Sequence, residues 1–417
     1  MARRVLTDVR LAGDATKRGI NMTEETELTD GPAGVLKARL RKALKGFESG
    51  LPDGVSVWDL SPHSPDSKLF PVPELVLFAL RNVLGFRWSG PWEKVRWTVY
   101  ATVDGEPFGF ALQKFGFRIL TRREVPPELL KRVTGQLSGS LKLLEPLLKI
   151  YAEEQIADGN LTLENRMGLY DGRYTYFREL ADQAFAVKPK VRKARQKKAD
   201  GDVGVLAGIT EQMNQMVKAE HRGFFASGAM IDAWFSRLEH RMLLLRAFIG
   251  KPMARGAFNT FLAARWDDRL VALFEGRMDT AAGDLLGRLR DVKATIRNPL
   301  AHGGVENDGG AFYFHLESVG AVPANLSRYR GRLRMSFVPI PATTHAEACA
   351  LFDAVDMLLT TGPFQLANEF VRWGIDPQFD AETVEAYGGA IAQGPEAVET
   401  LVEQLSREWE RHTNMDY

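Results

Sequence analysis

The feature that most restricts the fold is the helical spacing of apolar residues through the second half of the chain. In the segment 280–302, apolar residues recur every three or four positions and form one face. That face consists of Leu285, Leu289, Val292, Ile296 and Leu300. A face of this width needs other helices to cover it. We therefore predict a four-helix bundle over residues 208–375.

Three further segments complete the predicted bundle. Apolar residues keep helical spacing over 231–248 and over 258–274. The last helix is predicted to begin at Thr344 and Glu347, which have the spacing of a capping box. Two apparent strands, 312–316 and 328–338, interrupt the pattern between the third and fourth helices. They predict a β-hairpin insertion in the bundle.

The first half of the chain is of mixed type. Residues 1–70 are rich in Gly, Pro and Asp and predict an irregular arm with one basic helical stretch, Val35 to Phe47. Residues 71–180 predict a small α+β domain. Its strands are 95–103 and 108–120, joined by the pair Asp104-Gly105 that type I′ hairpins favour, and a helix with apolar spacing follows Pro126-Pro127, with Pro146 predicted to kink or split it.

The remaining segments are a linker and a tail. Lys188 to Lys198 holds seven basic residues and little apolar content, so we predict an exposed basic linker over 181–207. Residues 376–417 predict C-terminal helices, of which the last is amphipathic and acidic. The fold class expected for the whole chain is mainly α with an α+β N-terminal part.

Composition restricts the partners and the compartment. The 417 residues carry a net charge of only +1, so any nucleic-acid surface must be local. Cys349 is the single cysteine, which excludes an intrachain disulfide and fits a reducing compartment. No secretory signal or long apolar segment is apparent, so we expect a cytoplasmic protein without a membrane span. No motif indicates a cofactor or a metal site.

The predicted third helix ends in the sequence RNPLAHGG. It brings a permanent cation, Arg297, near His302, a group that titrates close to neutrality. Cleavage of RNA without a metal needs a base for the 2′-hydroxyl proton, an acid for the leaving oxygen and a cation for the phosphorane. Pro299 should distort the last turn, and Gly303-Gly304 should end the helix.

This stretch resembles the HEPN family, whose four-helix bundles carry Arg-x4–6-His near the end of the penultimate helix. Arg297, Asn298 and His302 match that motif, and Glu239 resembles the polar residue that many members place on the first bundle helix. The resemblance implies a metal-independent endoribonuclease whose site forms between two bundles of a homodimer. In such a homodimer we expect the second copy to cover the apolar face at Leu285, Leu289, Val292 and Ile296. The resemblance also implies a role in stress or antiviral defence as a toxin-like nuclease, with a sensing or regulatory N-terminal domain.

The chain departs from the family pattern at two places. Gly303 and Gly304 stand where many toxin members have a Tyr, and Pro299 lies inside the motif. An alternative therefore stays open: a non-catalytic HEPN-like module that binds a nucleotide or a protein. In that alternative Arg297 pairs with a carboxylate and His302 caps the helix end.

A second set of residues is consistent with RNA as the partner. Arg328, Arg330, Arg332 and Arg334 alternate with other residues, so one strand would place all four on one face, with Tyr329 near enough to stack a base. The competing interpretation is an edge strand protected by its charges. The other histidines, among them His221, His240 and His345, are expected at the surface.

Overall fold

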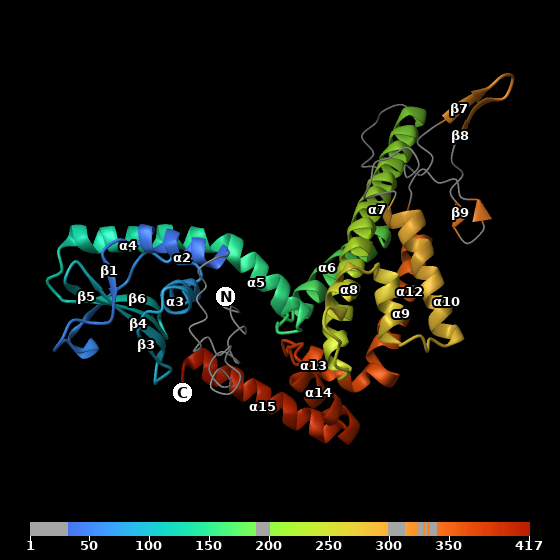
Figure 1. Cartoon of the computed structure of the whole chain (residues 1–417). Helices are drawn as coiled ribbons and strands as arrows, with labels where there is room; N and C mark the ends of the chain where they lie inside the picture. Colours follow the sequence, from blue (N-terminus) through green and yellow to red (C-terminus); the bar gives the residue numbers. More distant parts are fainter. Residues whose placement is uncertain (1–31, 189–200, 299–312, 324–327, 330–331, 334–339) are drawn as a thin grey trace. The chain divides into compact units, whose positions relative to one another are not determined.

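The protein is described by a computed structural model that covers residues 32–188, 201–298, 313–323, 328–329, 332–333 and 340–417. It divides into two compact units, coloured along the sequence in Figure 1. The first unit comprises Met1–Thr162 together with Val402–Tyr417, and the second comprises Leu163–Leu401. Each unit is described by itself.

The first unit is built on an antiparallel sheet of six strands. Its path is β1 (Phe47–Ser49), β4 (Val95–Val103), β5 (Glu106–Gln113), β6 (Gly116–Thr121) and β2 (Ser61–His63), and β3 (Trp88–Ser89) pairs with β4. The β4–β5 hairpin is confirmed. Asp104 and Gly105 both have positive φ, 51° and 84°, as a type I′ turn requires. The second predicted strand, 108–120, is wrong as one element, because the chain turns before Gly116 (φ 102°) and forms β5 and β6.

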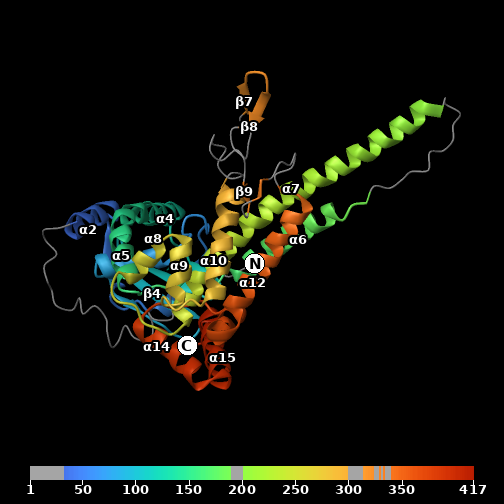
Figure 2. The same ribbon diagram turned by 90° about the vertical axis from the view of Figure 1, so that its right-hand side faces the viewer.

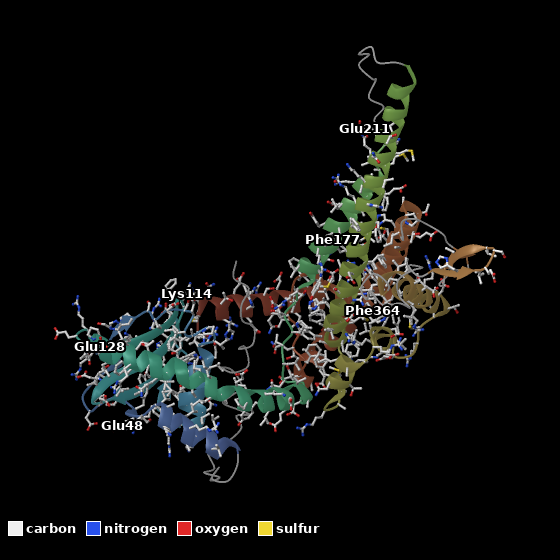
Figure 3. The ribbon with its side chains drawn as sticks, turned by 90° about the horizontal axis from the view of Figure 1, so that it is seen from above. Glu48, Lys114, Glu128, Phe177, Glu211 and Phe364 are labelled. Carbon is white, nitrogen blue, oxygen red and sulfur yellow. The ribbon has the colours of Figure 1, made fainter. Side chains whose placement is uncertain are left out.

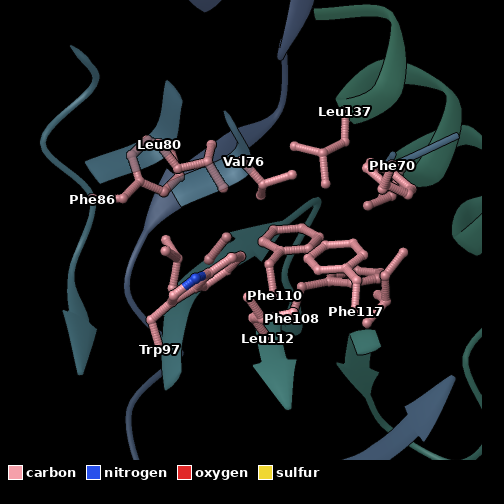
Figure 4. Close-up of a cluster of buried hydrophobic side chains, with 14 of the residues drawn as sticks. Phe70, Val76, Leu80, Phe86, Trp97, Phe108, Phe110, Leu112, Phe117 and Leu137 are labelled. Carbon is pink, nitrogen blue, oxygen red and sulfur yellow. The ribbon is translucent and has the colours of Figure 1, made fainter. Parts of the chain in front are cut away.

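Alternation along these strands buries one face of the sheet. Trp97 on β4, Phe108 and Phe110 on β5, and Phe117 on β6 project into one apolar cluster, where Leu137 from a covering helix meets them (Figure 4). Each of these side chains is at most 7% exposed. Residue Met415, from the other end of the chain, is buried in the same cluster.

Helices complete the first unit. They are α2 (Pro32–Ala43), the short η1 (Val57–Asp59), α3 (Glu74–Leu77) with η2 (Phe78–Val83), α4 (Pro127–Leu141), η3 (Lys142–Leu144) and α5 (Glu145–Ala157). The break between α4 and α5 confirms the predicted interruption at Pro146. Helix α2 confirms the basic helical stretch predicted at Val35 to Phe47, although it begins at Pro32 and ends at Ala43. The rest of the irregular arm predicted over 1–70 is wrong for residues 44–70, because they supply both sheet edges, β1 and β2. Residues 1–31 lie outside the described part.

The second unit is helical. Its elements are α6 (Met167–Phe185), α7 (Gly201–Phe248), α8 (Ala257–Ala263), α9 (Trp266–Leu273), α10 (Thr280–Val292), η4 (Lys293–Arg297), α12 (Ala342–Thr360), η5 (Gly362–Phe364), α13 (Gln365–Arg372) and α14 (Ala381–Gln393). The final helix, α15 (Pro395–Asn414), ends in the first unit. Among the described helices, none is long and apolar enough to cross a membrane.

Helix α7 is the longest element, with 48 residues. Phe185, at the end of α6, packs against Gly223, so the residues of α7 before Gly223 extend past the end of α6 (Figure 2). Figure 3 shows Phe177 on α6 beside α7 and Glu211 on the extending part. The predicted linker, 181–207, therefore includes the end of α6 and the start of α7, and its residues 189–200 lie outside the described part.

Several predictions for the second unit need correction. The boundary near residue 180 differs, because α6 belongs with the helical unit. Asn165, just before α6, donates from Nδ2 to the carbonyls of Val371 (2.9 Å) and Ile375 (3.2 Å). The helix predicted over 258–274 is two helices. The capping box at Thr344 is wrong, because α12 begins at Ala342 and Thr344 is already inside it, 2% exposed.

The apolar face of α10 is covered within the chain. Leu289 and Val292 are fully buried, and Ile296 is 7% exposed. This face was predicted to need a second copy of the chain to cover it, and that reason for dimerisation is wrong. Helix α10 packs against α12 instead, and η4, which continues the face, packs against α7.

The β insertion also differs from the prediction. β7 (Tyr313–Leu316) pairs with β8 (Gly320–Pro323), and β9 (Arg328–Tyr329) pairs with β10 (Arg332–Leu333). The predicted pairing of 312–316 with 328–338 is therefore replaced, among the described residues, by two short antiparallel pairs.

Candidate functional site

The candidate site is built where α10 ends in a wide helical turn. Over η4, the backbone follows a π-helix, and the N–H of Asn298 donates to the carbonyl of Lys293, five residues earlier. Single π-turns inside α-helices are common at functional sites. The next residue, Pro299, has no N–H to continue the helix, which explains a change of helical geometry here.

Arg297, the last residue of η4, points at α7. Its Nε donates to Oδ1 of Asp232 at 2.9 Å, and its Nη1 donates to Oδ1 of Asn298 at 3.4 Å. Among the described residues, no acceptor takes a hydrogen bond from Nη2. The side chains of Arg297 and Asp232 are 31% and 46% exposed. The guanidinium is thus oriented by a carboxylate and still reaches solvent.

Glu239 lies two turns further along α7, on the same face as Asp232. Its carboxylate is 3.6 Å from Nζ of Lys293 and 3.7 Å from Nη1 of Arg269. Glu239 therefore lies in the same row of charged side chains as Arg297. It is connected to that row through Lys293, and it makes no direct contact with Arg297 in any described interaction.

Lys293 is enclosed by aromatic rings. Its Nζ lies 4.8 Å from the centre of the Trp266 ring and 5.2 Å from that of Phe235, a cation–π arrangement. Burial lowers the pKa of the Lys293 ammonium below its ordinary value, against the opposing influence of Glu239. The enclosed ammonium fixes η4 against α7 and α9.

Three cations and two carboxylates thus lie along one line between η4, α7 and α9, which we call the charged seam. It consists of Arg297, Lys293, Arg269, Asp232 and Glu239. Arg297, at its open end, is the group that an anion from solvent would meet first, because the other two cations are 15% and 18% exposed. A phosphate is a suitable ligand for a guanidinium with free donors. His302, five residues beyond Arg297 in the sequence, lies outside the described residues.

The predicted arginine strand is not one strand. In the described hairpin, Arg332 is opposite Tyr329 and Leu333 is opposite Arg328. Residues directly opposite each other share a face of the sheet, so Arg328 and Arg332 lie on opposite faces and not on one face as predicted. Arg330 and Arg334 lie outside the described residues.

A hydrogen-bonded chain of side chains, missed in the sequence, links three helices and is buried except at Asp182, whose side chain is 60% exposed. His345 on α12 is 3% exposed; its Nδ1 is 2.9 Å from Oγ of Ser227 on α7, and its Nε2 is 2.9 Å from Oδ1 of Asp182 on α6. The order Ser–His–Asp resembles a nucleophilic triad, but Ser227 is fully buried. We assign the chain a structural role. Cys349 lies beside it, and burial raises the pKa of its thiol to about 11.

His240 is buried as well, at 8% exposure, and its Nε2 accepts the backbone N–H of Arg166 at 3.0 Å. Burial, with a smaller contribution from Arg166, lowers the pKa of His240 to about 4. The predicted surface positions of His240 and His345 are therefore wrong, whereas His221 is exposed. Sequence spacing gave no signal for either buried histidine, because their partners lie on other elements.

Among the described residues, no group of three or more His, Cys, Asp or Glu side chains is placed to hold a metal ion. The chain matches no family model, no curated protein and no solved structure.

Proposed function

We propose that this chain is a metal-independent endoribonuclease of HEPN type. The observation that carries the proposal is the oriented, solvent-reaching guanidinium of Arg297 at the end of a π-turn, five residues before His302. Asp232 fixes the guanidinium and leaves donors for a phosphate. Asn298, which accepts from Arg297, acts as a positioning residue.

In the proposed reaction, the imidazole of His302 removes the proton of a 2′-hydroxyl. The 2′-oxygen attacks phosphorus, the bond from phosphorus to the 5′-oxygen breaks, and a protonated imidazole donates its proton to that oxygen. Arg297 stabilises the negative charge that builds up on the non-bridging oxygens. The products carry a 2′,3′-cyclic phosphate and a 5′-hydroxyl.

One imidazole cannot be base and acid in the same step, so the proposal includes a second copy of the chain. A symmetric homodimer would bring two sets of Arg297 and His302 together. We further propose a setting in stress or antiviral defence, with the first unit as the sensing or regulatory part. Arg328, Arg330, Arg332, Arg334 and Tyr329 remain RNA-binding candidates.

The second candidate is a non-catalytic HEPN-like module that binds a nucleotide or a protein. The ion pair between Arg297 and Asp232 favours it, because a guanidinium that only joins two helices needs no substrate. In this candidate His302 takes no part in any chemistry.

One experiment separates the two candidates. Purified protein is incubated with total RNA in EDTA, beside the His302→Ala variant, and the ends of the products are identified. We expect cleavage by the unaltered chain, cyclic phosphate ends and loss of cleavage in the variant. Equal cleavage by both proteins, or none by either, would favour the binding module.

A further inference from the structure

The first unit carries a concentrated positive charge on α2 and the adjoining η3. Within 37–45 there are five cations and no acidic residue. We name these, with one cation of η3, the α2 surface. It consists of Lys37, Arg39, Arg41, Lys42, Lys45 and Lys142. All but Lys37, which is half-buried, are exposed.

The charges of the α2 surface are not used within the described fold. Among the described residues, none of its six side chains forms an ion pair with a carboxylate. The acidic residues nearest in sequence, Glu48 and Glu145, stand beyond Lys45 and Lys142 and are also exposed. The positive charge of the α2 surface is therefore not neutralised by carboxylates of the described fold.

The α2 surface stands on a rigid support. Leu36 and Leu40, on the opposite side of α2, are 6% and 0% exposed and pack against Leu144. Nε2 of Gln136 on α4 donates to the carbonyls of Ala43 (3.3 Å) and Lys45 (3.2 Å) at the end of the helix. The cations of α2 therefore stand on a helix whose apolar side is fixed against the core of the unit.

Helix stability does not explain the whole set. Cations in the last turn of a helix complement its dipole, which accounts for Arg41 and Lys42. Lys37 and Arg39 lie in the middle of α2, where that effect has faded. Together with Arg41 and Lys42 they extend the charge of α2 over roughly 8 Å of helix axis, at about 1.5 Å a residue, and Lys45 follows just after the helix ends.

We infer that the α2 surface binds the phosphate backbone of RNA. A row of unpaired cations fits a polyanion, and a nucleic-acid strand carries a charge about every 3.4 Å of axis. A membrane fits less well, because an amphipathic membrane helix needs a free apolar face, and the apolar face of α2 is buried. The inference rests on the proposed ribonuclease function only in the choice of RNA as the polyanion.

The test measures binding apart from cleavage. The probe is a fluorescent 2′-O-methyl oligouridylate, which lacks the attacking hydroxyl, and anisotropy gives its affinity for the full chain over a series of salt concentrations. One variant combines Arg39→Gln, Lys42→Gln and Lys45→Gln. A control variant removes three exposed cations elsewhere in the same unit, through Lys68→Gln, Arg123→Gln and Arg407→Gln. Circular dichroism checks that both variants are folded.

We expect the α2 variant to bind at least tenfold more weakly and to lose about two units of the slope of log affinity against log salt, at ~0.7 for each lost phosphate contact. The control variant should keep both. An unchanged slope in the α2 variant overturns the inference, as does loss of slope only in a variant with Arg328→Gln and Arg332→Gln. Binding to phosphatidylserine vesicles without binding to the probe overturns it as well.

These outcomes are separate from those of the proposed function. Binding through the α2 surface without RNA cleavage retains the inference and rejects the nuclease. Cleavage that depends on His302, with no contribution of the α2 surface to RNA binding, retains the nuclease and rejects the inference.

Discussion

At the scale of single residues, Arg297 and His302 allow a direct test of transition-state chemistry. We expect Arg297→Ala and His302→Ala each to lower RNA cleavage by about 10²–10⁴-fold, the usual contribution of general acid–base and electrostatic catalysis. The double variant should lose little more, because groups that act as one unit are not additive. Initial rates on a defined RNA oligonucleotide measure all three variants.

The matched control is Arg372→Ala. Arg372 is also paired with a carboxylate, although its partner, Glu369, lies on the same helix, and the side chain of Arg372 is 72% exposed. The Arg372→Ala variant should cleave RNA at the same rate as the unaltered chain. Equal losses for Arg372→Ala and Arg297→Ala would mean that any removed surface cation has the same effect, and Arg297 would have no special role.

His240 gives a prediction about pH and stability. Its pKa is about 4 in the folded chain, against about 6.5 when unfolded. Protons therefore bind the unfolded state more tightly, so stability is full above the unfolded pKa and falls as pH decreases toward the folded pKa. By pH 5 the loss from this one group is about 2 kcal/mol, on the order expected for such a shift.

The comparison variant is His240→Gln, whose amide oxygen still accepts the N–H of Arg166 but does not titrate. Urea unfolding at pH 7 and at pH 5 measures the free energy of unfolding for both proteins. The variant should lose less stability over this interval than the unaltered chain. An identical loss in both would assign the acid sensitivity to carboxylates elsewhere.

At the scale of elements, the sequence was sufficient to predict those whose conformation depends on residues close together in the chain. The Asp104-Gly105 turn, the break before Pro146 and the acidic last helix all follow from residues within one or two turns of each other. The turn and the break are imposed by single residues, through a positive φ or a missing N–H. The last helix follows from its own helical spacing of apolar residues.

Elements fixed by distant partners were not predictable in the same way. β1 and β2 have three residues each, too few for alternation to appear, and they form only because β4 and β6 offer free edges. The π-turn of η4 gives no periodic signal. The ion pair of Arg297 with Asp232 joins residues 65 positions apart, so the sequence identified one partner and not the other.

The chain Ser227–His345–Asp182 yields a prediction about how α6, α7 and α12 are held together. In His345→Ala, the buried hydroxyl of Ser227 loses its partner and a cavity is left. We expect a loss of about 2–4 kcal/mol in the free energy of unfolding, from an unsatisfied buried group and lost packing. Urea denaturation measures this value.

His221→Ala is the control, since His221 is an exposed histidine on the same helix, α7. Its effect should be within about 0.5 kcal/mol, as for most surface substitutions. A similarly small effect for His345→Ala would show that the packing of the three helices does not depend on the hydrogen bonds of His345 with Ser227 and Asp182.

At the scale of the whole molecule, the first unit is completed by the end of the polypeptide. Met415 is 7% exposed in its core, and its carbonyl accepts the backbone N–H of Lys94 at 2.9 Å. The Lys94 ammonium also forms an ion pair with Asp416. The sequence could not indicate this, because more than 300 residues separate the partners. The predicted division into consecutive domains therefore differs from the observed units.

The last prediction concerns association of whole chains. The proposed reaction needs a base and an acid of the same residue type, so a single chain with one His302 should be inactive and a symmetric pair active. Light scattering at micromolar concentration should give the mass of two chains. Specific activity should fall on dilution through the dissociation constant, because monomers lack a complete site.

The His302→Ala variant should still associate, which separates loss of chemistry from loss of the pair. The α10 face that the sequence offered as the contact is buried within one chain, so the pair must use another surface. A monomeric mass together with activity that does not depend on concentration would exclude the composite site. Cleavage would then require an acid other than His302 within the same chain, and Lys293, with its lowered pKa and its place in the seam, is the group to replace next.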